Sequence, residues 1–224
     1  MRKKRWIIST SALFAIVISA LILPVFATSY TFYAPYPSGN GSTWGTGIIS
    51  KSAYMNPNTG TGNIYSSASG NGHAYADVFC GGLAPSSSEG MQAVSLSSGQ
   101  YVSFGGKIYL NGYIKSHHSQ GDAYGKVSAY IAIYKGTYHI ATKTYTWSQV
   151  YYVEIVQGYV SGSDQQQNFN GYIYPSTVWQ VTSSGMYTMK LGIKGEGYAY
   201  SMLLNDYGQA SFGTVTVSYT QIIK

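Results

Sequence analysis

Apolar and polar side chains alternate with a period of two along most of the chain after residue 26. The alternating runs are bounded by Gly, Asn, Ser and Pro, and no run shows the spacing of an amphipathic helix. We expect strands at residues 101–114, 150–160, 169–174, 186–194, 198–204 and 211–223. Strands at this spacing, without helical crossovers, predict an all-β fold, an antiparallel β-sandwich of the jelly-roll or immunoglobulin-like type.

Residues 126–146 contain the clearest hairpin pattern. Two alternating runs flank Lys135 and Gly136, and two-residue loops are the commonest hairpin connections. Pairing across this turn would place five apolar residues on one buried face, namely Val127, Ala129, Ile131, Ile133 and Ile140. The opposite face would carry Tyr130, Tyr134, His139 and Ala141, a composition that suits a solvent-exposed or interface side.

Residues 1–27 have the features of an export signal. A basic stretch at residues 2–5 precedes an apolar run at residues 6–26, and the small residue Ala27 follows. We expect a signal helix that is cleaved after Ala27, because Pro24 ends the apolar helix there. The apolar run is also long enough to span a bilayer, so a retained membrane anchor is the alternative.

The charge distribution argues against nucleic acid as a partner. The formal net charge of +6 falls to +2 without residues 1–27, because this segment holds four basic residues and no acidic one. No arginine follows Arg5, and arginine is the main residue for phosphate and guanine contacts. We therefore expect no nucleic-acid partner, and membrane contact only through an uncleaved signal segment.

The rest of the chain, residues 28–224, is nearly uncharged and rich in tyrosine. It holds nine lysines, seven carboxylates and all 24 tyrosines. A surface with so little charge repulsion favours self-association or glycosylation, and surface tyrosines contact protein partners or stack on sugars. The single cysteine, Cys80, excludes an intrachain disulfide, and we expect it to be a buried structural thiol.

We expect one β-sandwich domain at residues 48–224, preceded at residues 28–47 by an extended strand and a flexible linker. The linker is indicated by the Gly-, Ser- and Thr-rich composition of residues 37–47. Alternation in the strand places on one side the residues Tyr30, Phe32 and Ala34. This strand either pairs within its own domain or acts as a donor strand that completes the sheet of a neighbouring subunit.

Few residues have spacings that suit catalysis, metal binding or modification. Glu154 and Glu196 are the best pair for a retaining glycosidase, which needs two carboxylates about 5 Å apart, although the glycines around Glu196 predict a loop. His117 and His118 are adjacent and would point to opposite faces of a strand, so no metal or other cofactor is expected. Asn40 begins the single Asn-x-Ser/Thr sequon and is the candidate for N-glycosylation.

In its organisation the chain resembles the archaeal surface filament subunits known as threads and bundling pili. The resemblance rests on the signal segment, the strand-like tip at residues 28–36, the hinge that follows it and the low-charge β-rich body. It implies subunits joined head to tail by an N-terminal donor strand. We therefore predict a secreted, cell-surface structural or adhesive protein without enzymatic activity that assembles with copies of itself. A carbohydrate-binding module for surface glycans is the alternative, and a glycoside hydrolase is the third hypothesis.

Overall fold

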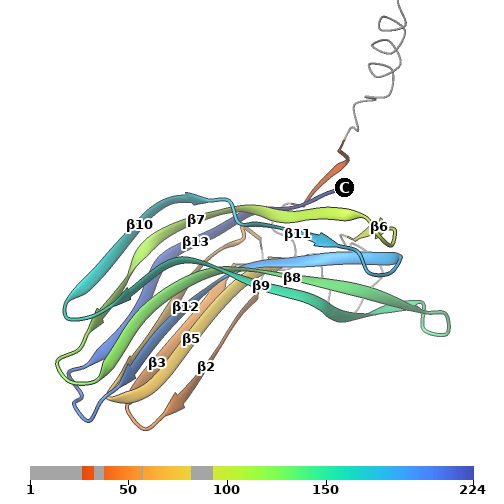
Figure 1. The fold of residues 1–224 in the computed structure, drawn as a ribbon. Helices are drawn as coiled ribbons and strands as arrows, with labels where there is room; N and C mark the ends of the chain where they lie inside the picture. Colours follow the sequence, from red (N-terminus) through yellow and green to blue (C-terminus); the bar gives the residue numbers. More distant parts are fainter. Residues whose placement is uncertain (1–26, 33–37, 57, 82–92) are drawn as a thin grey trace, which may run out of the picture.

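The computed structural model describes residues 27–32, 38–56, 58–81 and 93–224. Two antiparallel β-sheets stack to form a sandwich (Figure 1), which confirms the all-β fold expected from the sequence. The described residues form no helix, and so none that could cross a membrane. The expected signal helix at residues 1–26 lies outside the described part of the chain. The expected cleavage after residue 27 stays a prediction.

The larger sheet has seven strands, five of which lie in the order β10-β7-β13-β4-β3. β1 pairs with the end of β13, and β11 pairs with β7. The bounds of these strands are β1 (Ser29–Phe32), β3 (Ile48–Met55), β4 (Thr61–Ser69), β7 (Tyr101–His117), β10 (Gln165–Ile173), β11 (Ser176–Gln180) and β13 (Tyr207–Ile223). The predicted strands at residues 101–114, 169–174 and 211–223 are thus present, each with shifted ends.

The smaller sheet has six strands, five of which lie in the order β2-β5-β12-β8-β9, while β6 pairs with β12. Their bounds are β2 (Ser38–Gly45), β5 (Asn71–Gly81), β6 (Val94–Leu96), β8 (Asp122–His139), β9 (Thr144–Ser161) and β12 (Gly185–Tyr200). Two separate strands were expected at residues 186–194 and 198–204. The structure instead has one long strand, β12, which ends at Tyr200.

Period-two alternation divides the central strands of the smaller sheet into an inner and an outer side. On β8 the inner residues are fully buried between the sheets, as the hairpin pattern predicted: Val127, Ala129, Ile131 and Ile133. β12 adds Tyr187, Met189, Leu191 and Ile193 to the same core. The other side of these strands faces away from the larger sheet, and we call it the outer face. It carries polar and aromatic side chains, some exposed and others, such as Tyr130 and Glu196, largely buried.

The predicted hairpin turn at Lys135 and Gly136 is wrong. β8 continues through both residues to His139, and the chain turns at residues 140–143. Gly136 is held by pairing with β12 on one side and β9 on the other, and these two ladders outweigh the local turn preference of a Lys-Gly pair. Ile140 consequently lies in the turn with 85% of its surface exposed, instead of on the buried face.

The N-terminal strand pairs within its own chain, which is the first of the two alternatives above. In β1, Tyr30 lies opposite Ile222 and Phe32 lies opposite Thr220 of β13. The Tyr30 side chain is half-buried and packs against the core. Ala34, the third residue expected in a donor strand, lies outside the described residues.

The segment expected to be a flexible linker contains a strand. Residues 38–45 form β2, which pairs with β5 over its whole length and forms one edge of the smaller sheet. A Gly- and Ser-rich segment has little intrinsic preference for a strand. Pairing with β5 satisfies its backbone N–H and C=O groups, so tertiary contacts override the local composition here. The linker prediction is therefore corrected for residues 38–45.

Candidate functional site

The outer face consists of rows of side chains that run across neighbouring strands. Residues that are opposed in an antiparallel ladder lie side by side, so the registers of four ladders define these rows. One row holds Trp44, His73, Tyr198 and Tyr124. The next holds Tyr75, Glu196, Lys126 and Tyr159. The two that follow hold Asn40, Asp77 and Lys194, and then Phe79, Gly192, Tyr130 and Glu154. Aromatic rings and charged groups thus alternate over five strands.

The first row, together with Tyr159 of the next row, forms a continuous aromatic ladder. The centroid of the His73 ring lies 4.1 Å from that of Trp44 and 5.7 Å from that of Tyr198. Tyr198 stacks on Tyr124 at 4.9 Å, and Tyr124 lies 5.4 Å from Tyr159 on β9. Trp44 and Tyr159, at the two ends, are 51% and 53% exposed. The ladder therefore reaches from one edge strand of the sheet to the other and presents open ring surface at each end.

Tyr130 forms the floor of a groove beside this ladder. Its ring lies over the backbone of Gly192 on the neighbouring strand, and its hydroxyl donates a 2.8 Å hydrogen bond to Asp77 Oδ2. Only 7% of Tyr130 is exposed. Burial, and then the charge of Asp77, raise the pKa of Tyr130 well above its usual value, so the hydroxyl remains a donor. Burial likewise raises the pKa of Asp77, and the Tyr130 hydrogen bond opposes that shift.

The groove above Tyr130 is open and has a volume of about 460 Å³, within the usual range for small-ligand sites. Aromatic rings line much of it, and polar groups complete it. The lining residues are Asn40, Tyr75, Asp77, Phe79, Tyr130, Ala132, Tyr134, Gln149, Tyr152, Lys190 and Lys194. Lys190 Nζ lies 4.3 Å from the centroid of the Phe79 ring, a cation–π contact that fixes this ammonium group at the wall.

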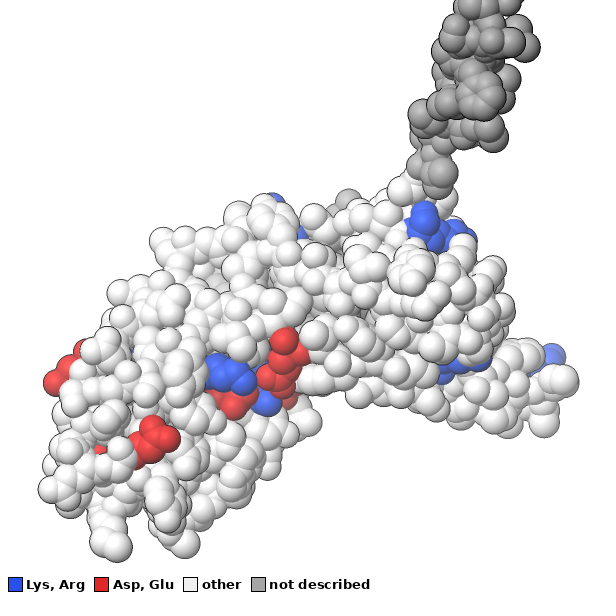
Figure 2. Space-filling view, in the orientation of Figure 1, with Lys and Arg blue, Asp and Glu red and all other residues white. Residues whose placement is uncertain are grey.

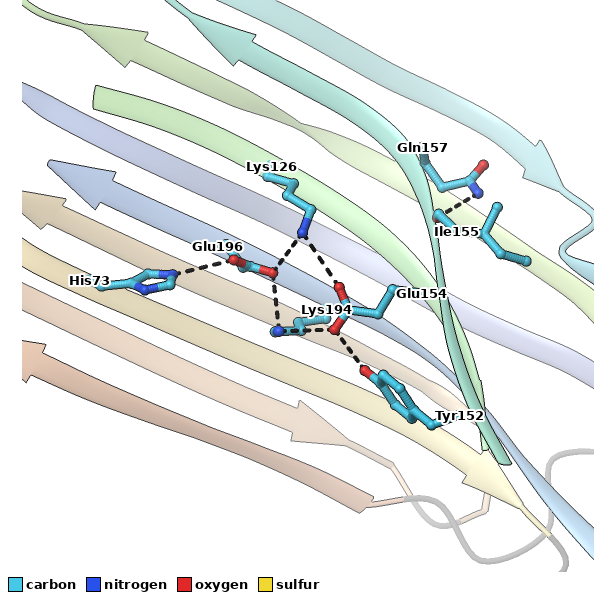
Figure 3. A network of polar contacts seen from close by, with 8 residues as sticks. All are labelled: His73, Lys126, Tyr152, Glu154, Ile155, Gln157, Lys194 and Glu196. Carbon is cyan, nitrogen blue, oxygen red and sulfur yellow. Dashed lines mark hydrogen bonds and ion pairs between the residues drawn. The ribbon is translucent and has the colours of Figure 1, made fainter. Parts of the chain in front are cut away.

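Four charged residues form a closed cluster between the ladder and the groove (Figure 3), which we call the ion quartet. It consists of Lys126, Glu154, Lys194 and Glu196, from β8, β9 and β12. Lys126 Nζ lies 3.4 Å from Glu154 and 3.2 Å from Glu196. Lys194 Nζ lies 3.0 Å from Glu154 and 3.1 Å from Glu196. Each lysine therefore bridges both carboxylates, and the four charges cancel.

The surroundings of the quartet keep both carboxylates ionised. Burial alone would raise the pKa of Glu196, but the hydrogen bond with His73 and the charge of Lys194 outweigh it and lower the pKa to about 2. Burial also opposes the shift at Glu154, whose pKa is nevertheless lowered by the hydroxyl of Tyr152, which donates a 2.7 Å hydrogen bond, and by Lys194. The quartet thus offers fixed charges and hydrogen-bonding groups rather than a proton donor.

The structure brings together the two glutamates that the sequence paired. Both lie on the outer face and share two lysines. The loop expected at Glu196 is wrong, because the residue lies within β12. The flanking glycines face the larger sheet, where a Cβ at Gly195 would lie 2.9 Å from Ala210 and one at Gly197 would lie 2.4 Å from the Gly208 carbonyl oxygen. They are glycines because the two sheets approach closely here.

The other sequence candidates lie apart from this site or at its rim. His117 Nδ1 is 2.8 Å from Asp164, and the part of the chain that the structure describes has no group of three His, Cys, Asp or Glu residues that could hold a metal. Cys80 is buried in the core, as expected, and burial raises its pKa to about 12. Asn40 is exposed on β2 and lines the groove, while its glycosylation stays a prediction.

Sequence reasoning missed one wall of the site entirely. No strand was predicted between residues 48 and 81, where the structure has β3, β4 and β5. β5 supplies four outward residues of the outer face: His73, Tyr75, Asp77 and Phe79. The signal was present, because they alternate with the buried residues Ala74, Ala76, Val78 and Cys80. Alanine has a low preference for strands, which obscured the pattern.

Comparison with known proteins assigns no family. No protein-family model and no curated protein matches the chain. The enzymatically active domain of bacteriophage CBA120 tailspike protein 4 has a TM-score of 0.26 and 11% identity, with 80% of this chain and 19% of that one covered. TmCBM61 in complex with β-1,4-galactotriose has a TM-score of 0.21 and 12% identity, covering 79% and 88%. The xylan-binding domain from CBM 22 has a TM-score of 0.19 and 9% identity, covering 87% and 97%.

These similarities are too low to bear on function. The chain spans about a fifth of the tailspike chain, and 40% of the infectious bursal disease virus VP2 chain, which has a TM-score of 0.25 and 9% identity. The β-sandwich assignment rests on the two stacked sheets of this chain and not on these structures. What the outer face binds has to be argued from its own residues.

Proposed function

We propose that this protein is a secreted, surface-acting carbohydrate-binding module whose outer face holds a glycan. The observation that carries the proposal is the open groove of about 460 Å³ in which aromatic rings lie next to a closed ion quartet. A sugar ring has apolar C–H faces and a rim of hydroxyls. Aromatic side chains stack on the faces, and carboxylates and ammonium groups exchange hydrogen bonds with the hydroxyls.

Several side chains are placed for these two kinds of contact. Tyr152 is 44% exposed in the groove, and Trp44 is 51% exposed at the end of the aromatic ladder. Each ring keeps its orientation through a neighbour, since Tyr152 bonds to Glu154 and Trp44 packs edge-on against His73. Rings that are held in place lose little conformational entropy on binding, which favours affinity.

Binding to a glycan array tests the proposal, followed by titration of the best ligand. Tyr152→Ala and Trp44→Ala should each weaken binding by roughly tenfold, the loss of one stacking contact. Tyr172→Ala is the matched control, because this tyrosine is 54% exposed on β10 of the other sheet. The proposal fails if no glycan binds, or if the control weakens binding as much as Tyr152→Ala and Trp44→Ala do.

We also propose that the site binds without hydrolysing. A glycosidase needs one carboxylic acid with a raised pKa as its general acid. The pKa values of both Glu154 and Glu196 are lowered instead, and both carboxylates are engaged by Lys126 and Lys194. Prolonged incubation with the array ligand should release no new reducing ends. Release that disappears in Glu154→Gln would instead support the glycoside hydrolase hypothesis.

Assembly into extracellular filaments is the second candidate, as the sequence first suggested. The observation in its favour is that β1 is a four-residue strand that pairs only with the end of β13. The same pairing made with the β13 of another copy would link subunits by donor-strand complementation. Deletion of residues 28–32 should then abolish filaments in negative-stain micrographs of the mature protein. Filaments that persist after this deletion would exclude the donor-strand mechanism.

A further inference from the structure

The ion quartet contains four of the six charged residues in and beside the groove. Its lysine and glutamate side chains are largely covered, with 22% of Lys126 and Lys194, 24% of Glu154 and 6% of Glu196 exposed. Figure 2 shows basic and acidic atoms side by side in the middle of a surface that is otherwise mostly uncharged. Charges arranged in this way satisfy one another and leave little field for a charged ligand.

The charges of the groove lining and of the adjoining ion quartet balance when they are counted together. The basic residues are Lys126, Lys190 and Lys194, and the acidic residues are Asp77, Glu154 and Glu196. Lys51 on β3 donates to the Gly41 carbonyl at one margin, and Asp122 at the start of β8 lies near the other, where its charge acts on Tyr124. The margins therefore add one charge of each sign, and the charges of these described residues sum to zero.

We infer that this balance is the specificity determinant of the proposed glycan site, and that it restricts the ligand class to uncharged chains. The inference rests on the proposed function and adds to it the basis of ligand choice. A uronic-acid chain would have to compete with Glu154 and Glu196 for the same two ammonium groups. A cationic amino-sugar chain would have to compete with Lys126 and Lys194 for the same two carboxylates.

Removing one charge from the quartet should therefore weaken the preference for neutral ligands, and the sign of the removed charge decides which charged ligand gains affinity. Glu154→Gln keeps the shape of the side chain and an oxygen that can accept from Tyr152, but leaves one lysine charge in excess. Lys126→Gln leaves one carboxylate charge in excess. The double variant Lys126→Gln/Glu154→Gln restores neutrality and is the matched control.

The test is calorimetric titration of the four proteins with hexasaccharide probes. The probes are neutral hexamers of glucose, xylose, mannose and galactose, an anionic hexamer of galacturonic acid and a cationic hexamer of glucosamine. Wild type should bind a neutral hexamer at least tenfold more tightly than either charged one. Glu154→Gln should gain roughly tenfold for the galacturonate hexamer, and Lys126→Gln should gain similarly for the glucosamine hexamer. Added salt should erase both gains.

Each outcome bears on the inference. Wild type that binds a neutral hexamer, together with single variants that gain nothing for the charged probes, would overturn the inference and leave the proposed function intact. If wild type binds no hexamer, both the inference and the proposed function are overturned. A gain that persists in the neutral double variant would mean that shape rather than charge sets the choice. If one single variant fails to fold in circular dichroism, the other tests the opposite sign independently.

Discussion

The ring of Tyr130 occupies the space directly above Gly192, where a Cβ would come within 2.5 Å of the ring carbon that bears the hydroxyl. The two residues lie opposite each other on β8 and β12. The absence of a side chain at Gly192 lets the ring cross β12 and reach Asp77 on β5. The floor of the groove therefore depends on a glycine that contributes no contact group of its own.

Gly192→Ala should displace the Tyr130 ring, break its hydrogen bond to Asp77 and destabilise the protein by about 1–3 kcal/mol, the usual effect of overpacking. Chemical denaturation measures the stability, and glycan titration should show weaker binding. Gly171→Ala is the matched control, because a Cβ there meets no atom within 4 Å and the residue also lies in a strand. Equal effects of the two substitutions would contradict the role assigned to Gly192.

Glu196 should make stability depend on pH in the acid range. Its pKa is lowered from 4.5 to about 2 in the folded protein, so its contribution is fully present above pH 4.5 and is lost as pH falls toward 2. Wild type should exceed Glu196→Gln in unfolding free energy by about 2–3 kcal/mol at neutral pH. Urea denaturation at several pH values should show this difference vanish near pH 2.

The comparison with Glu196→Gln isolates this residue from other acids. The pKa of Asp206 is also lowered to about 2, through hydrogen bonds from Ser201 and Ser119. Asp206 therefore affects stability in the same pH range, but it does so equally in wild type and in Glu196→Gln. Asp77 has a raised pKa and acts with the opposite sign. A difference between the two proteins that stays constant from pH 7 to pH 2 would contradict the assignment to Glu196.

Cys80 should be inert in the folded protein. It is fully buried between the sheets, and burial raises its pKa to about 12, so almost no thiolate forms at neutral pH. A colorimetric thiol reagent should label the native protein no faster than the protein unfolds, and should label one thiol per chain in denaturant. Rapid labelling under native conditions would show that the core opens at β5.

Ile131 and Ile140 should respond very differently to the same substitution, although the sequence pattern placed them on one buried face. Ile131 has no exposed surface and Ile140 is 85% exposed. Ile131→Ala should cost about 2–5 kcal/mol of stability, whereas Ile140→Ala should change it by less than about 0.5 kcal/mol. Thermal or chemical unfolding measures both. A large loss of stability in Ile140→Ala would mean that Ile140 is buried and that the turn lies elsewhere.

The sequence predicted best where alternation involves large side chains. Large apolar residues at every second position predict a buried side on β8 and β12. The structure buries all four of them: Ile131, Ile133, Leu191 and Ile193. The fold class follows from such runs. Turn positions could not be predicted in the same way. The turn preference of the Lys-Gly pair on β8 is outweighed by strand pairing with β12 and β9. In the turn at residues 140–143, Lys143 adopts a φ of 52°. Gly and Asn are the usual residues at a positive φ, and this turn contains neither, so the sequence did not indicate it.

The site was harder to predict than the fold, because it forms from distant strands. Glu154 and Glu196 could be chosen from the sequence as the best pair, but the bridging lysines depend on the sheet order β5-β12-β8-β9, in which β8 lies between β12 and β9. That order sets residues of β5 beside residues more than a hundred positions later. Tyr75 and Asp77 could not be placed beside Glu196 and Lys194 by any local pattern, since only the sheet register puts them there.

The backbone at the two ends of the described sandwich is joined by a pair of hydrogen bonds. Thr28 N donates to Lys224 O at 2.8 Å, and Lys224 N donates to Thr28 O at 3.0 Å. A short peptide could therefore connect these residues, with new termini opened at the exposed turn of residues 140–143. For engineering, we expect the described sandwich to tolerate circular permutation at that turn. It can also be inserted whole into a surface loop of a host protein, because both of its attachment points lie side by side.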